Sequence, residues 1–487
     1  MARKIFHFLI FLGVAIPALA EREEPRALDC SHVLAWVVGG MTRPRLERLA
    51  NERGLDFVIT QKEATELLKS GAEPRLVQSL REMKASPSDV QRSSCPAQLV
   101  VVGELVRQKR YEQAEPIMQR LIASHPKDSA LRFAFGYIQQ QQNDWDAAFD
   151  AYLDSRNLMP GLSDTHARLA YVFYRYDDGD NAIAEARTGL SIDPRNSEAY
   201  RYLGLGFHAN QRYVYAIRAF QESLALEPGN AETYYDLGIT LRSNGDVNGA
   251  ASAYRKAIAL KPQFWEAYNN LAMLQHDMKN LDAAIMTYQK AKHLAPQEPR
   301  IRYNLGKTYL DKGDFDSAIA EFRQLFRISP DSKGGHSSFA QALLAKGDFK
   351  AAIPELRLAI LQDPTAAAEH RVLGQALLMA NKQEEALREL RVAVQLDPDS
   401  SLAHHYLGTA LLNLGQVEAA ETEFREALRL APTADNHYSL AACLITMGHY
   451  EDAVGELDTA VSLRPGEIVY RARKEELLKL MRMSASR

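Results

Sequence analysis

Residues 231–264 read AETYYDLGITLRSNGDVNGAASAYRKAIALKPQF, and this stretch decides the fold. Apolar residues recur in it at spacings of three and four, first over residues 234–243 and again over residues 247–260. This spacing places them on one face of each of two helices. Gly245 and Asp246 predict a turn between the helices. Pro262 ends the second helix because it lacks an amide donor and disfavours helical backbone in the residue before it.

The same pattern recurs along most of the chain. One proline returns at nine successive intervals of 34 residues and a last interval of 33. These prolines are Pro126, Pro160, Pro194, Pro228, Pro262, Pro296, Pro330, Pro364, Pro398, Pro432 and Pro465. An alanine stands twelve residues before each of them. A single helix pair cannot bury its apolar face alone, so neighbouring pairs must stack into a continuous core.

The repeated unit resembles the tetratricopeptide repeat. That family has an aromatic residue near position four, Leu-Gly at seven and eight, Ala at twenty, an aromatic at twenty-four, Ala at twenty-seven and Pro at thirty-two. In residues 231–264 these positions hold Tyr234, Leu237, Gly238, Ala250, Tyr254, Ala257 and Pro262. The first two units depart from it, with Leu121 and Ser155 where alanine is usual. The resemblance covers residues 95–466 and implies about eleven units in an all-α superhelix, a solenoid of stacked helix pairs.

Residues 1–20 have the pattern of a cleavable signal peptide. Arg3 and Lys4 precede an apolar run over residues 5–16, and small residues at Ala18 and Ala20 follow. An uncleaved membrane anchor is the alternative, although the run is shorter than the roughly 20 residues that span a bilayer. The pattern predicts export to the periplasm or the exterior, with no integral membrane segment after cleavage. The sequence has no Asn-x-Ser/Thr site, which favours a bacterial envelope.

The three cysteines are Cys30, Cys95 and Cys443. Export implies an oxidising compartment in which cysteines can pair. Cys30 and Cys95 bracket a short N-terminal segment, so they are the candidate disulfide. Two unpaired, buried thiols are the alternative, because spacing alone does not establish a disulfide.

The regions at the two ends lie outside the repeat. Residues 21–94 predict a small helical module with helices over 30–38, 44–53, a stretch from the capping box of Thr60 and Glu63 to Gly71, and 73–84, followed by a linker. A cap over the apolar face of the first repeat is the alternative interpretation. Residues 467–487 predict a C-terminal capping helix. Its arginines and lysines leave a membrane-surface helix as the alternative.

Composition and motifs argue against catalysis and nucleic-acid binding. The chain has 58 Lys and Arg against 62 Asp and Glu, so no basic excess attracts nucleic acid or anionic lipid. It has no phosphate-binding glycine loop, no HExxH and no Gly-x-Ser-x-Gly. We therefore expect no enzyme activity and no cofactor or metal. An unrecognised active site in residues 21–94 is the remaining enzymatic alternative.

Histidine occupies position four in four consecutive units, at His336, His370, His404 and His437. A metal-binding ladder is one interpretation of this series. Equivalent positions of stacked pairs lie on the order of 10 Å apart, however, whereas zinc ligands sit about 2 Å from the metal. We therefore interpret these residues as rings packed in the core, in place of the usual aromatic.

The resemblance also implies which residues face a partner. In the family, positions two, five, six, nine and twelve of each unit line the concave groove. Here these positions give Arg201, His208, Tyr235, Arg242, Asn269, Asn270, Tyr303, Asn304 and Lys307. Asn270 and Asn304 share position six, which is similar to the asparagine ladder that grips peptide backbone in the repeats of protein O-GlcNAc transferases. Leu205 and Ile239 do not match the carboxylate clamp of chaperone cofactors.

These residues predict an exported scaffold that binds a protein or an extended peptide in its concave groove. A structural component of an envelope polysaccharide or protein export or assembly complex is the alternative function. The simplest alternative for the groove residues is a solvated polar stripe, which any surface helix carries.

Overall fold

The computed structural model describes residues 27–83 and 95–485. These residues form 27 helices, α1–α27, and one isolated parallel bridge between Leu28 and Leu55. The chain divides into two compact units, residues 1–262 and residues 263–487, each described by itself below. The predicted signal peptide and the predicted linker over residues 85–94 lie outside the described residues. Helices α5–α26 form eleven consecutive pairs, so the prediction of an all-α repeat solenoid is confirmed.

The N-terminal module, residues 28–83, consists of four short helices of unit 1. They are α1 (Cys30–Val38), α2 (Arg43–Arg53), α3 (Gln61–Lys69) and α4 (Pro74–Glu82). The backbone amide of His32 donates to the Asp29 carboxylate at 2.8 Å, which caps α1. Thr60 and Glu63 form the predicted capping box at the start of α3.

Five helix pairs follow in unit 1. They are α5 (Ala97–Arg107) with α6 (Tyr111–Ser124), α7 (Ser129–Gln141) with α8 (Trp145–Leu158), α9 (Ser163–Arg175) with α10 (Gly179–Ile192), α11 (Ser197–Ala209) with α12 (Tyr213–Leu226), and α13 (Ala231–Ser243) with α14 (Val247–Leu260). Each first helix packs against its second helix, as the amphipathic pattern predicts.

Six pairs and a last helix form unit 2. They are α15 (Trp265–Asp277) with α16 (Leu281–Leu294), α17 (Pro299–Lys312) with α18 (Phe315–Ile328), α19 (Gly335–Ala345) with α20 (Phe349–Gln362), α21 (Ala367–Met379) with α22 (Gln383–Leu396), α23 (Ser401–Asn413) with α24 (Val417–Leu430), α25 (Ala434–Met447) with α26 (Tyr450–Leu463), and α27 (Ile468–Ala485). Helix α27 packs on α26 and buries Tyr470 and Leu477, so it covers the end of the core.

The glycine at position eight brings the two helices of a pair together. A Cβ atom added to Gly238 would lie 2.6 Å from the Tyr254 ring, and one added to Gly306 would lie 2.9 Å from the Phe322 ring. Both rings are almost fully buried. A larger residue at these positions would force the paired helices apart.

In every described pair, the turn between the two helices places one residue at a left-handed φ. Gly245 has a left-handed φ of 86°, which glycine adopts without steric cost. The Asp246 carboxylate then accepts a hydrogen bond from the amide of Gly249 at 2.8 Å and caps the second helix. Other pairs place a residue with a side chain in this left-handed position, including Gln211 and Lys279. In the described ranges, no helix is long and apolar enough to cross a membrane.

Candidate functional site

The first helices of successive pairs form one wall of each unit. Helices α9, α11 and α13 contact one another in unit 1, as do α15, α17 and α19, and then α21, α23 and α25, in unit 2. We call the surface made by these first helices the inner surface. All nine predicted groove residues lie on first helices, four of them in unit 1 and five in unit 2.

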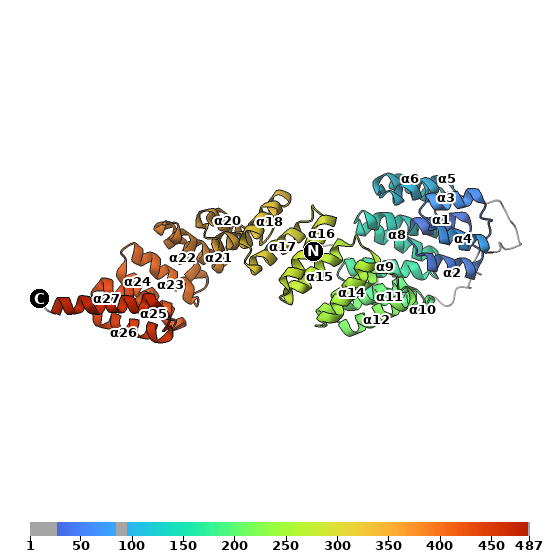
Figure 1. Ribbon diagram of the computed structural model, residues 1–487. Coiled ribbons are helices and arrows are strands. Elements are labelled where there is room, and N and C mark those ends of the chain that lie inside the picture. Colours follow the sequence, from blue (N-terminus) through green and yellow to red (C-terminus); the bar gives the residue numbers. More distant parts are fainter. Residues whose placement is uncertain (1–26, 84–94, 486–487) are drawn as a thin grey trace, which may run out of the picture. The chain divides into compact units, whose positions relative to one another are not determined.

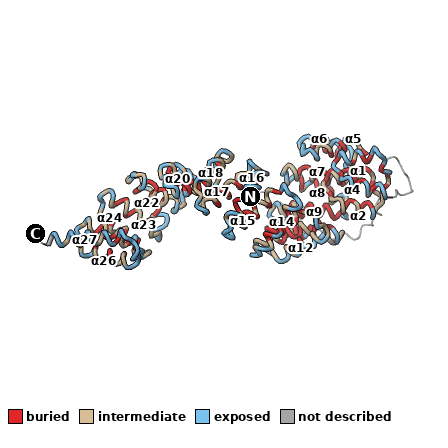
Figure 2. Tube along the Cα trace, viewed as in Figure 1, coloured by how far each residue is buried: buried red, intermediate tan, exposed pale blue. Residues whose placement is uncertain are grey.

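The N-terminal module covers the inner surface of unit 1. Helix α1 packs on the first helices α5 and α7, and Figure 1 shows α1–α4 lying against this part of the repeats. The fully buried Trp36 of α1 shares one core with Phe133 of α7 and Leu169 of α9. Figure 2 accordingly colours the trace around α1, α7 and α9 largely as buried. The module therefore occupies the inner surface over α5, α7 and part of α9, in addition to adjoining the first repeat.

Buried ion pairs fix the module in place. The Arg45 guanidinium of α2 lies 2.9 Å from the Asp164 carboxylate and 2.6 Å from that of Asp193. Only 6% of the Arg45 side chain is exposed. Burial disfavours its charged form, but the two carboxylates outweigh burial and raise the pKa of Arg45. The guanidinium therefore stays charged inside the interface.

A second contact comes from Arg168 of α9. Its Nη2 atom donates to the Gly40 carbonyl at 3.0 Å and lies 3.3 Å from the Glu198 carboxylate. Asp164 and Arg168 hold positions two and six of their unit, which are groove positions in the family. In the repeat formed by α9 and α10, the chain's own module therefore occupies the place that a partner would take.

Cys30 and Cys95 form a disulfide, with their Cα atoms 5.0 Å apart. The bond joins the start of α1 to the residues just before α5, so it ties the module to the repeats. The alternative of two unpaired thiols is therefore wrong in this structure. Cys443 is a free, buried cysteine whose pKa burial raises to about 11.

Two of the unit 1 candidates bind the neighbouring repeat. Arg201 Nε donates to Asp236 at 2.6 Å, and His208 Nδ1 lies 3.0 Å from the Thr240 hydroxyl. Burial lowers the pKa of His208, which favours the neutral ring. These contacts join α11 to α13. The other two candidates, Tyr235 and Arg242, are half-buried on α13.

The unit 2 candidates gather on α15 and α17. The Asn304 amide donates to Asn269 Oδ1 at 3.2 Å, and the Asn269 amide donates to Asn270 Oδ1 at 3.3 Å. The asparagine side chains thus form hydrogen bonds within α15 and between α15 and α17. Lys307 is exposed, and its ammonium lies 5.8 Å from the centre of the Tyr303 ring. Tyr303, Asn304 and Lys307 therefore form one polar patch on α17.

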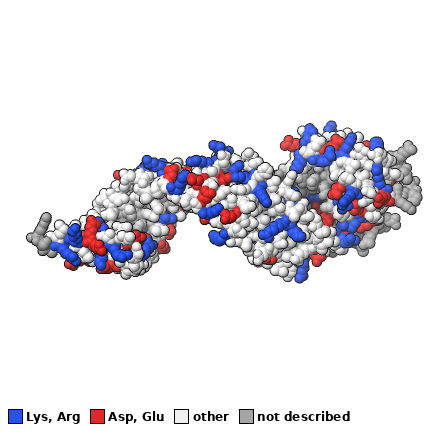
Figure 3. Space-filling model, in the orientation of Figure 1, with Lys and Arg blue, Asp and Glu red and all other residues white. Residues whose placement is uncertain are grey.

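Sequence reasoning missed the inner surface of α19–α25. At positions two, five, six, nine and twelve of these four units, all within the described residues, Arg371 and Asp435 alone carry a full charge. Half-buried apolar residues at these positions are Leu344, Val372, Leu378, Tyr406, Leu412, Tyr438 and Ile445. Leu402 is 54% exposed. Figure 3 shows a largely uncharged area where Figure 2 labels α22, α23 and α24. The register of the repeat was the signal that could have found this surface.

The histidine series has a polar role as well as a packing role. His336, His370 and His404 are buried, and the Nδ1 atom of each lies within 2.7 Å of a glutamate nineteen residues later. The Nε2 atom of each faces the carbonyl of the preceding repeat proline, at 3.0 to 3.3 Å. Both ring nitrogens are therefore engaged by the protein. Over the described ranges, no group of three metal-binding side chains comes together.

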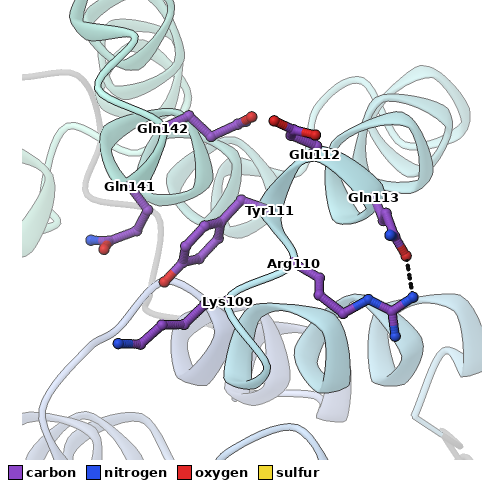
Figure 4. A pocket seen from close by; sticks show the side chains of 7 residues that line it. All are labelled: Lys109, Arg110, Tyr111, Glu112, Gln113, Gln141 and Gln142. Carbon is purple, nitrogen blue, oxygen red and sulfur yellow. Dashed lines mark hydrogen bonds between the residues drawn. The ribbon is translucent and has the colours of Figure 1, made fainter. Parts of the chain in front are cut away.

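A hollow of about 430 Å³ lies at the turn between α5 and α6 (Figure 4). Its lining side chains are Lys109, Arg110, Tyr111, Glu112, Gln113, Gln141 and Gln142. Arg110 donates to Gln113, as the dashed line marks, and Gln142 donates to Glu115 beside the hollow. The lining holds no cysteine, serine or histidine that could act as a nucleophile or its base. We therefore do not assign a catalytic site here.

Three tetratricopeptide-repeat families match the chain, one over residues 104–158 and 235–299, one over residues 277–341 and 309–376, and one over residues 401–434. The eleven observed helix pairs agree with these matches. The chain is a tetratricopeptide-repeat protein. Proteins of this fold typically act as scaffolds for protein interaction and not as catalysts.

Solved structures with a similar fold include the Cut9–Hcn1 hetero-tetramer of the APC/C, at 17% identity and a TM-score of 0.46 over 76% of this chain and 73% of that one. Yeast Tom70 aligns at 15% identity and a TM-score of 0.33 over 78% and 95%. MamA aligns at 28% identity and a TM-score of 0.29 over 33% and 93%. With TM-scores below 0.5, nothing about the function of this chain follows from them. No curated protein matches the sequence significantly.

Proposed function

We propose that this protein is an exported scaffold that binds a protein partner along the inner surface of unit 2. The observation that carries the proposal is the difference in occupancy between the two inner surfaces. Trp36 and Arg45 of the module pack on the inner surface of unit 1 at α7 and α9. No described segment of unit 2 lies on the inner surface of α19–α25 in the same way.

The inner surface of unit 2 offers two kinds of contact. The patch on α17 presents the Lys307 ammonium and the Tyr303 ring. The stretch over α19–α25 presents half-buried apolar side chains and the more exposed Leu402. A protein or an extended peptide with a polar end and an uncharged, apolar segment fits this order of contacts. Binding then depends on shape and polar complementarity over several repeats, and the protein catalyses no reaction and needs no cofactor.

Two features favour the export that this proposal includes, and the first is the disulfide. Disulfides persist in oxidising compartments and are rare in the cytosol, so the bond between Cys30 and Cys95 favours a periplasmic or extracellular protein. The positive, apolar and small-residue pattern of residues 1–20 favours the same destination. We propose the bacterial envelope, where the partner would also reside.

Site-specific photocrosslinking in the native envelope tests the binding surface. We place a photoreactive side chain at Tyr303 or Leu378 on the inner surface, and at Leu361 of α20 as the control. Leu361 is 77% exposed and belongs to a second helix of the same unit, so it reports contacts outside the inner surface. We expect one partner to crosslink from both inner positions and not from Leu361.

A triple variant provides the loss-of-binding arm. Asn270→Ala, Tyr303→Ala and Asn304→Ala together should abolish capture of that partner while the helical signal stays unchanged. Capture by the folded triple variant, or crosslinks confined to Leu361, would contradict the proposed surface. Crosslinks to an outer-membrane barrel or a glycan would instead favour a structural component of an export or assembly complex.

A further inference from the structure

Exposed arginine side chains and an exposed tyrosine surround the buried Phe207 ring where α11 turns into α12, in unit 1. The guanidinium carbon of Arg212 lies 4.9 Å from the centre of the Phe207 ring and 4.8 Å from that of Tyr215. The guanidinium carbon of Arg187, from α10, lies 5.8 Å from the Phe207 ring centre. The two rings are themselves 5.5 Å apart. We call Arg187, Phe207, Arg212, Val214 and Tyr215 the α11–α12 cluster.

Stacking on the rings orders the two arginines without neutralising them. Along the described chain, neither Arg187 nor Arg212 forms an ion pair with a carboxylate, whereas Arg45, Arg156 and Arg201 all do. The carboxylate of Asp180, on the same helix as Arg187, accepts a hydrogen bond from Asn210 and forms no ion pair with either arginine in the described structure. A guanidinium held over an aromatic face keeps its N–H edge available for a carboxylate.

The cluster is also unusually apolar for an exposed turn. Val214 is 65% exposed and Tyr215 is 53% exposed, and they are adjacent in sequence. Arginine and tyrosine side by side are the residue types that dominate the energy of protein interfaces. Two unpaired positive charges beside an apolar step therefore call for a partner with complementary charge and an apolar side chain.

We propose that the α11–α12 cluster binds an acidic segment of a partner protein, with carboxylates on Arg187 and Arg212 and an apolar side chain against Val214 and Tyr215. Charge complementarity selects this occupant. The module reaches the repeats through the loops before α11 and α13, by Asp193 and Glu227. The cluster is at the other end of α11, so a docked module leaves it accessible. The site is separate from the inner surface of unit 2 and does not depend on that assignment.

The test uses the mature full-length protein and a short synthetic peptide of alternating glutamate and leucine. Titration by fluorescence anisotropy should show binding that weakens as salt is raised. Arg187→Glu with Arg212→Glu should weaken binding at least about tenfold, because each arginine contributes a charge-assisted hydrogen bond. Tyr215→Ala should weaken binding by a smaller factor. Circular dichroism checks that each variant remains folded.

Matched controls separate this site from general attraction between charges. Arg107→Glu, at an exposed arginine of α5 in the same unit, should leave peptide affinity within about twofold of the parent. A peptide with glutamine in place of glutamate should not bind. Equal binding of both peptides, or unchanged affinity in the folded double variant, would overturn the proposal. So would binding to phosphatidylglycerol vesicles or inorganic phosphate through the two arginines without binding of the acidic peptide.

Discussion

The two units use the same helix pair but treat its inner surface in opposite ways. In unit 1, Ser163 to Ala170 of α9 are all buried, and the module contacts Asp164 and Arg168 among them. In unit 2 the corresponding helices α21 and α23 keep half-buried side chains such as Val372 and Tyr406. The repeat therefore fixes how a pair is built, whereas residues outside the repeat decide what covers it.

The difference extends to charge. Unit 1 buries Arg45, Asp164 and Arg168 at the interface of module and repeats. Buried charges are tolerated only when each has a partner, so this interface depends on all of its members. Unit 2 has two full charges at the corresponding positions of α19–α25. We expect unit 1 to respond strongly to changes in the module and unit 2 to be insensitive to them.

Removing the disulfide should produce the largest difference between the units. The loop closed by Cys30 and Cys95 spans 65 residues. The chain-entropy model gives a loss of about 4 kcal/mol for the Cys30→Ser, Cys95→Ser variant. Hydrogen exchange followed by mass spectrometry should show faster exchange in α1 and α7 and unchanged exchange in α21 and α23. Equal acceleration in both units would contradict this division.

Arg45→Ala should destabilise unit 1 by about 3 kcal/mol, because it leaves the Asp164 and Asp193 carboxylates without their partner. Denaturant unfolding of the full chain, with exchange data to assign the transition, measures the loss. Arg357→Ala is the matched control in unit 2, where the exposed pair with Glu385 should contribute less than about 1 kcal/mol. A loss no larger than that of the control would mean that the module is not held by this pair.

Replacing the glycine at position eight should destabilise both units equally, because the two units share the packing within a helix pair and differ only in what covers it. Gly238→Val in unit 1 and Gly306→Val in unit 2 should each cost about 2 kcal/mol, because the added side chain meets the Tyr254 or Phe322 ring. Thermal unfolding of the two variants provides the measurement. A large cost in one unit and none in the other would show that the pairs do not share one packing rule.

The start of α1 should depend on pH. Burial opposes the charge on His32, but its hydrogen bond and attraction to Asp29 raise the pKa of His32 overall. Burial likewise opposes ionisation of Asp29, but His32 lowers the pKa of Asp29 overall. The stability that charged His32 gives to the folded state is therefore fully present below its ordinary pKa, and it is lost as pH rises through the raised pKa. The stability that ionised Asp29 gives to the folded state is fully present above its ordinary pKa, and it is lost as pH falls through the lowered pKa.

The pair thus stabilises α1 most in the mildly acidic range between these two limits. Exchange of α1 amides should quicken between about pH 6 and pH 8, after correction for intrinsic rates, by an amount worth less than about 1 kcal/mol. The His32→Gln variant should show no such change, and neither should the helices of unit 2. An identical response in the variant would assign the effect to other groups.

The smallest effect concerns the turns within pairs. Gln211 in unit 1 and Lys279 in unit 2 hold the left-handed position that Gly245 holds elsewhere. Replacing either with glycine relieves backbone strain at some entropic cost, so we expect stabilisation of about 0.5 kcal/mol in each unit. Thermal unfolding should show a small rise in midpoint for both variants. A fall in either would mean that the side chain has a packing role in the turn.

Much of the fold could be predicted from local pattern. The helix over 247–260, the α1 helix over 30–38 and the capping box of Thr60 and Glu63 were all predicted from sequence and agree with the structure. Less of the candidate site could be predicted. Arg201 and His208 bond to Asp236 and Thr240 of the next repeat, so they also hold α11 to α13. That they and the other groove residues bind a partner stays a prediction.

The sequence by itself determined the helix pairs, their turns and their stacking, because each of these depends on residues within one repeat or the next. The tertiary structure alone decided which inner surface is covered. Arg45 meets Asp164 across 119 residues, and no periodic pattern connects two such positions. Each repeat makes the same short-range contacts with itself and its neighbours, whereas contact with the non-repeating module arises only once the chain has folded.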